Sequence, residues 1–191
     1  MSNTRVWLFR FLILAAGAFL VWTWFQPWWE SIIREADFFI QIRPWGLEHN
    51  LGPYVVYIPA LKQPMPAFFA PAMWVYLGLC IAAILYSLFA KNKKFNIWKL
   101  RFNLPSFLIG VVGLSYIIVA AAAYLMGSIR TAALGVFFRG TTYVELDLFP
   151  VGANADSDLT LGFWLACAAG PLLVILALLR NKIIGKNKIE S

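Results

Sequence analysis

The sequence predicts an all-α transmembrane protein: a four-helix bundle with both termini cytoplasmic and a small extracellular β-sheet formed by the two outer loops. Three observations support this prediction: four long apolar runs, basic residues concentrated in alternate connecting segments, and strand-like patterns in the other two segments. Together they indicate that residues 1–191 form a single integral membrane domain.

The apolar runs cover residues 7–29, 66–90, 104–129 and 161–179, and Arg10 is the only charged residue inside them. A helix that spans a bilayer needs about 20 apolar residues. A Lys, Arg or Asp at the centre of such a helix costs ~2.5–3.5 kcal/mol on insertion scales. Each run therefore predicts one transmembrane helix.

The charges predict how these helices are oriented. Most of the 16 basic residues precede the first run, join the second run to the third at 91–103, or follow the fourth. Of the nine acidic residues, all but Glu190 lie in the two other connecting segments, at 30–65 and 130–160. The positive-inside rule then places both termini in the cytoplasm and these two loops outside, for a multi-pass protein of the cell membrane. The basic residues thus indicate topology and contact with membrane lipid, and we expect no binding to nucleic acid.

Both outer loops contain strand-like patterns. Apolar residues alternate with other residues at 38–43, residues 54–58 are β-branched and aromatic, and residues 143–148 alternate between apolar and acidic or polar side chains. Such patterns favour half-buried strands, so we expect both loops to contribute to one sheet.

For two further stretches, residues 28–33 and the inner loop, we do not expect strands. Trp28, Trp29, Ile32, Ile33 and Ala36 share one face at helical spacing, which predicts that residues 28–33 extend the first helix. The alternative is that this stretch lies in the membrane interface. The inner loop at 91–103 is short and basic, and we expect it to be irregular.

Small residues at four-residue spacing are expected to bring the helices close together. The expected packing residues are Gly162, Ala166 and Gly170 in the fourth run, Gly78 and Ala82 in the second, and Ala123 and Gly127 in the third. These contacts can lie within the bundle or join it to another subunit. Pro171 removes a backbone hydrogen bond inside the fourth helix and is expected to kink it.

The sequence offers little catalytic chemistry, so we predict no enzyme activity, no cofactor, and no catalytic or metal-binding residue. His49 is the only histidine, the two cysteines lie inside the apolar runs, and no catalytic motif occurs. Asp156 and Asp158 are expected in a loop, where the simplest interpretation is a solvated acidic face. With Glu48 and His49 they could instead bind Ca²⁺.

The long outer loops are the expected site of function, because loops of this length usually carry structure or function of their own. Trp45 and Leu47 lie in a turn that contains Pro and Gly, and Glu145 and Asp147 share one face of the strand predicted at 143–148. These four residues are the predicted contacts with another membrane protein subunit or a second copy. The predicted function is that of an accessory, scaffold or adhesion-like subunit.

The alternative function is a small transporter or channel subunit whose pore forms by oligomerisation. Ser115 and Tyr116 are the polar side chains in the third run that such a pore would use. Their other interpretation is hydrogen bonding between helices.

The topology and three short segments resemble the claudin and peripheral-myelin-protein-like group of four-helix membrane proteins. Gln26-Pro27-Trp28-Trp29 is similar to the sequence that ends their first span, Trp45-Gly46-Leu47 to the signature of their first loop, and residues 161–170 to their last span. The resemblance implies cytoplasmic termini and a small sheet over the bundle. The first outer loop departs from that family, because it contains no cysteine where theirs holds a disulfide.

Overall fold

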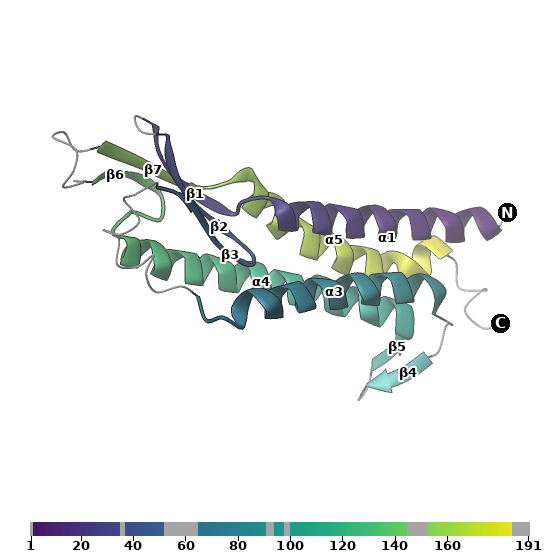
Figure 1. The fold of residues 1–191 in the computed structure, drawn as a ribbon. Helices are drawn as coiled ribbons and strands as arrows, with labels where there is room; N and C mark the ends of the chain where they lie inside the picture. The colour runs from purple at the N-terminus through teal and green to yellow at the C-terminus, as the bar shows by residue number, and fades with distance from the viewer. Residues whose placement is uncertain are drawn as a thin grey trace. The chain divides into compact units, whose positions relative to one another are not determined.

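The computed structural model describes residues 2–34, 37–51, 65–90, 94–97, 100–144 and 153–184. These residues form four α-helices and seven strands (Figure 1). The chain divides into two compact units. Unit 1 contains Met1–Thr23, Val75–Val119 and Ala166–Ser191, and unit 2 contains Trp24–Trp74 and Ala120–Leu165.

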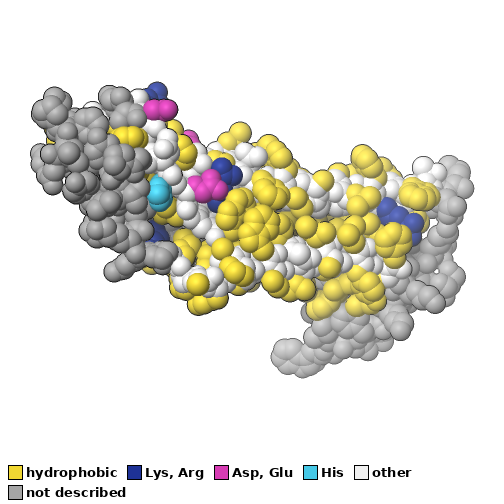
Figure 2. Space-filling model, viewed as in Figure 1, with side chains coloured by type: hydrophobic (Ala, Val, Ile, Leu, Met, Phe, Trp, Pro, Cys, Tyr) yellow, Lys and Arg dark blue, Asp and Glu magenta, His cyan; other side chains and the backbone are white. Residues whose placement is uncertain are grey.

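The four predicted spans are confirmed as helices. They are α1 (Ser2–Phe25), α3 (Phe69–Phe89), α4 (Leu104–Leu134) and α5 (Leu161–Ile184), and each is long and apolar enough to cross a membrane. Large hydrophobic side chains such as Phe11, Leu79 and Leu178 remain exposed along them. In Figure 2 hydrophobic side chains cover much of the visible face of the helices. Surfaces of this kind are expected for a multi-pass membrane protein.

Proline and glycine define several helix ends. Pro71 and Pro105 lie in the first turns of α3 and α4, where a missing N–H removes no intrahelical bond. Helix α4 ends before Gly135, which has a φ of 74°. The N–H of Gly135 donates to the Ala132 carbonyl and the next N–H donates to the Thr131 carbonyl, which is the Schellman arrangement.

The core of unit 1 consists of buried apolar side chains from all four helices, including Ile13, Ile84, Ile109 and Leu173. Hydrogen bonds between described side chains also join helices within it. The hydroxyls of Thr23 and Tyr116 lie 3.0 Å apart, and those of Tyr76 and Ser115 also lie 3.0 Å apart. The polar side chains Ser115 and Tyr116 therefore make contacts between helices.

Helices α4 and α5 approach each other closely in unit 1. A Cβ atom added at Gly170 would lie 2.8 Å from the carbonyl oxygen of Gly113, and one added at Gly113 would lie 2.7 Å from the carbonyl oxygen of Gly170. The two backbones are therefore in contact, and only glycine fits at either position. Ala166, one turn before Gly170, is buried.

The other small residues differ in their packing. Gly162 packs against the backbone at Pro27, and Gly127 packs against the ring of Phe138. Gly78 and Ala82 are exposed, and a Cβ atom at Gly78 would meet nothing within 4 Å. Within the described part of the chain α3 instead buries a face of larger residues that includes Leu77, Cys80 and Ile84. Contact of Gly78 and Ala82 with another subunit stays a prediction.

Unit 2 contains a five-stranded antiparallel sheet. Its strands are β1 (Trp29–Ile33), β2 (Phe38–Arg43), β3 (Gly46–Asn50), β6 (Gly140–Val144) and β7 (Ala153–Leu159), in the spatial order β3-β2-β1-β7-β6 (Figure 1). The predicted small sheet with strands from both long segments is thus confirmed, and β2 coincides with the strand predicted at 38–43. The strand predicted at 54–58, and residues 145–148 of another, lie outside the described residues.

Residues 28–33 do not extend the first helix, so that prediction is wrong. Residues 29–33 form β1, the central strand, which pairs with β2 on one side and β7 on the other. Pro27 precedes the strand, and Trp29, Ser31 and Ile33 are buried in alternation with less buried residues. The other face of β1, which carries Glu30 and Ile32, is also partly covered. Apolar residues therefore occur on both faces of the strand, and their spacing also fits one face of a helix.

Two smaller predictions are also corrected. Asp156 and Asp158 lie in β7 and not in a loop, because the alternate residues Ala155, Ser157 and Leu159 face the buried side. The described residues of the segment at 91–103 are not irregular, because β4 (Lys94–Ile97) and β5 (Leu100–Asn103) pair as antiparallel strands. Its aromatic and β-branched residues favour strands.

Candidate contact surface

The sheet in unit 2 has one buried and one more exposed face. On the buried face Ile42, Trp29 and Leu159 form one row across β2, β1 and β7, and Ile40, Ser31 and Ser157 form the next. The Ser157 hydroxyl donates to the Ser31 hydroxyl at 2.9 Å, and the Trp29 indole N–H donates to the Phe138 carbonyl at 2.7 Å. These bonds satisfy polar groups that would otherwise be costly to bury.

The opposite face carries polar and charged side chains in register. Glu48, Gln41, Glu30 and Asp158 form one row across β3, β2, β1 and β7. Arg139 donates to Asp158 at 2.9 Å at one end of this row. In the adjacent row the hydroxyl of Thr141 donates to Asp156 at 2.8 Å, and Arg34 lies 3.8 Å from the same carboxylate. We define the polar face as Glu30, Arg34, Gln41, Arg43, Glu48, Arg139, Thr141, Asp156 and Asp158.

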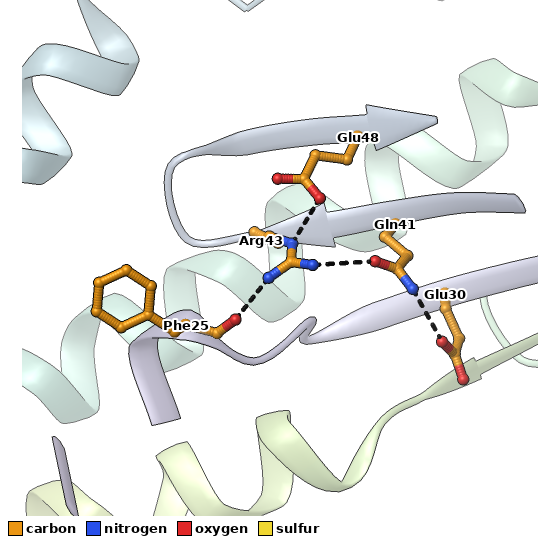
Figure 3. Close-up of polar contacts among 5 residues, drawn as sticks. All are labelled: Phe25, Glu30, Gln41, Arg43 and Glu48. Carbon is orange, nitrogen blue, oxygen red and sulfur yellow. Dashed lines mark hydrogen bonds and ion pairs between the residues drawn. The ribbon is translucent and has the colours of Figure 1, made fainter. Parts of the chain in front are cut away.

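Arg43 connects the polar face to the end of α1 (Figure 3). Its Nη1 donates to the carbonyl of Phe25 at 2.5 Å, its Nε lies 2.8 Å from Glu48 Oε2, and its Nη2 donates to Gln41 Oε1 at 3.4 Å. Gln41 Nε2 in turn donates to Glu30 Oε2 at 3.4 Å. Phe25 is the last residue of α1, where carbonyls lack helical partners and a positive charge is favourable. Arg43 therefore stabilises this helix end and the sheet together.

Glu30 and Asp158 are directly opposite each other on neighbouring antiparallel strands. Like charges in this arrangement repel and destabilise the strand pair. Gln41 and Arg139 offset part of that repulsion through the bonds described above. A further positive charge placed over the two carboxylates would reduce it more.

Aromatic rings form a second feature of unit 2. Trp45, in the turn between β2 and β3, has its ring centroid 5.0 Å from that of Trp74 and 5.7 Å from that of Phe25. Further ring contacts extend this cluster to residues of α4 and α5. We define the aromatic belt as Trp24, Phe25, Trp28, Trp45, Trp74, Tyr124, Phe138 and Phe163. Rings of this kind are typical of the boundary between lipid and water.

Of the four predicted contact residues, the structure describes Trp45 and Leu47. Trp45 is half-buried in the aromatic belt, where Arg43 lies 5.7 Å from its ring centroid. Leu47 pairs with Ile42 and therefore lies on the buried side of the sheet. Glu145 and Asp147 lie outside the described residues. Partner contact by these four residues stays a prediction.

Glu48 and His49 do not act together, because neighbouring residues of a strand project to opposite faces. Glu48 forms an ion pair with Arg43, and His49 pairs with Ile40 in the register of the buried side. Among the residues that the structure describes, no group of three His, Cys, Asp or Glu side chains could hold a metal ion.

The sequence did not predict the row of Glu48, Gln41, Glu30 and Asp158. The assignment of 28–33 to a helix removed Glu30 from the sheet and hid the register that aligns the four residues. Pro27, which interrupts backbone hydrogen bonding just before β1, was the available signal. No protein-family model, curated protein or solved structure matches the chain.

Proposed function

We propose that this chain is a non-enzymatic four-span protein of the cell membrane that contacts another protein through its five-stranded sheet. In this proposal both termini lie in the cytoplasm and the sheet lies outside. The distribution of basic residues supports this orientation, because 11 of the 16 Lys and Arg residues belong to unit 1, which contains both termini. The aromatic belt supports a membrane boundary near the sheet.

The observation that carries the proposal is the polar face. The carboxylates of Asp156 and Asp158 are accessible, since these side chains are 50% and 64% exposed. The same carboxylates are oriented by hydrogen bonds and ion pairs from neighbouring segments. A partner that binds an oriented surface loses less conformational entropy than one that must order it.

The charge of the polar face indicates the chemistry of the partner. Glu30 and Asp158 repel each other across β1 and β7, and a Lys or Arg side chain placed over them would relieve this repulsion. We therefore propose that the partner is a different protein with a basic surface or segment. Two copies of this chain are less suitable partners through this face, because unit 2 has more acidic than basic residues and would repel its own copy.

The test is copurification of the tagged full-length protein in mild detergents, with partners identified by mass spectrometry. The double variant Glu30→Gln/Asp158→Asn is expected to lose the partner, and the wild-type complex is expected to weaken as salt concentration rises. The matched control is Asp37→Asn, which removes one exposed charge from the β1–β2 turn outside the polar face. A solitary monomer in every detergent, or a double variant that retains its partner as the control does, would refute the proposal.

A further inference from the structure

A pocket in unit 1 combines two arginine side chains with an apolar wall. It has a volume of about 170 Å³ and lies between the start of α1, the end of α3 and the end of α5. Its polar lining includes Arg10, Ser87 and Arg180, and its apolar lining includes Val6, Phe9 and Ile184. Because ~10–15 Å³ of such volume holds one water molecule, the pocket has room for a larger chemical group.

The two guanidinium groups make this pocket electropositive. Arg180 is 7% exposed, and its Cζ lies 5.9 Å from the ring centroid of Phe9, within the range of a cation–π contact. Arg10 is half-buried, with its Cζ 5.5 Å from the ring centroid of Trp7. The described part of unit 1 contains no Asp or Glu. Charge of this kind away from water favours an anion nearby.

We propose that this pocket binds the phosphate group of an anionic phospholipid. Guanidinium groups bind phosphate oxygens through two parallel hydrogen bonds, and two such groups face this pocket. Val6, Phe9 and Ile184 offer apolar contact to the glycerol and upper acyl region, which a free phosphate ion does not need. Helices α3 and α5 both end at the pocket, and their carbonyl ends disfavour an anion, so binding depends on both arginines.

The site is independent of the partner surface, because the pocket belongs to unit 1 and the polar face belongs to unit 2. Loss of partner binding therefore leaves this proposal intact, and failure of this proposal leaves the partner surface intact.

The experiment measures lipid binding to delipidated full-length protein in detergent by native mass spectrometry. The probes are phosphatidylglycerol, phosphatidylcholine with the same acyl chains, and inorganic phosphate. We expect phosphatidylglycerol to bind most tightly, and Arg10→Gln and Arg180→Gln each to weaken it about tenfold or more, as expected for a lost charge-assisted bond. The matched control is Arg5→Gln, which removes an exposed charge from the same helix outside the pocket and is expected to leave the affinity unchanged.

Three results would overturn the proposal. One is equal affinity for phosphatidylcholine and phosphatidylglycerol, which would remove the role of the anionic headgroup. A second is displacement of phosphatidylglycerol by inorganic phosphate at equal concentration, which would identify the ligand as the free ion. The third is that Arg10→Gln has no larger effect than Arg5→Gln; this comparison does not depend on the buried Arg180, so it stands even if Arg180→Gln fails to fold.

Discussion

The contact between Gly113 and Gly170 predicts that a single methyl group in either helix destabilises unit 1. In Gly170→Ala the new Cβ atom would lie 2.8 Å from the Gly113 carbonyl oxygen and 2.7 Å from Cγ1 of Ile117, whereas ordinary contact begins at 3.4 Å. The carbonyl oxygen belongs to the backbone and cannot rotate away, so α4 and α5 must separate along this contact. Overpacking of this kind costs about 1–3 kcal/mol.

The control for this prediction is Gly78→Ala, because a Cβ atom there meets nothing within 4 Å. Removing a glycine from a helix interior without a clash is expected to stabilise it by up to about 1 kcal/mol. Unfolding of the purified protein in a graded series of denaturing detergent, monitored by helical circular dichroism, gives the free energy of each variant. Gly170→Ala is expected to unfold at lower denaturant than wild type, and Gly78→Ala at the same or higher denaturant. If Gly170→Ala and Gly113→Ala are both as stable as Gly78→Ala, the two helices do not touch as described.

Three further predictions concern unit 1, unit 2 and topology. Tyr116→Phe removes the hydroxyl that bonds Thr23, and the same denaturation experiment is expected to show that the free energy of unfolding falls by about 0.6–1.5 kcal/mol. The loss is small because Thr23 keeps its bond to the Leu20 carbonyl, and an unchanged free energy would contradict the buried bond. Arg43→Ala is expected to destabilise the β2–β3 hairpin by about 1.5–3 kcal/mol. Arg43→Lys is expected to recover less than half of this loss, because one ammonium group cannot reach the acceptors on Phe25, Glu48 and Gln41 together. Hydrogen exchange of the β2 and β3 amides measures this effect, and equal protection in all three proteins would contradict it. For topology, single cysteines are introduced as Asp158→Cys or Lys182→Cys into a variant that lacks Cys80 and Cys167. A membrane-impermeant maleimide is expected to label Asp158→Cys in intact cells and Lys182→Cys only after permeabilisation. The reverse pattern would show that the proposed orientation is inverted.

The sequence predicted the four helices well because each run exceeds the length that a bilayer requires and is almost free of charge. Alternation of apolar residues also identified β2, and the presence of strand patterns in two distant segments predicted a shared sheet. The small-residue pattern located Gly170 but not its partner Gly113, since Gly113 belongs to no repeat at four-residue spacing. Spacing within one helix cannot reveal which position of another helix it meets.

The candidate contact surface was less predictable than the helices. The polar face depends on the register of four strands, and a shift of one residue in any strand would move its side chains to the other face. Residues 28–33 satisfy both helical and strand spacing, because β1 is central and partly covered on both faces. The hydrogen bond from Arg43 to the Phe25 carbonyl depends on tertiary structure alone, and no local sequence pattern predicts it.

The position of β1 at the centre of the sheet has a consequence for biosynthesis. β1 ends at Ile33 and its neighbour β7 begins at Ala153, so about 120 residues must be translated between them, which takes about 6–25 s at 5–20 residues per second. Throughout that interval the nascent β1–β2–β3 hairpins exist with one edge of β1 unoccupied, at a stage when later helices are still on the ribosome. An open edge recruits other strands readily. We therefore expect the free edge of β1 to be prone to mispairing with other strands until β7, the last strand of the sheet, has been synthesised.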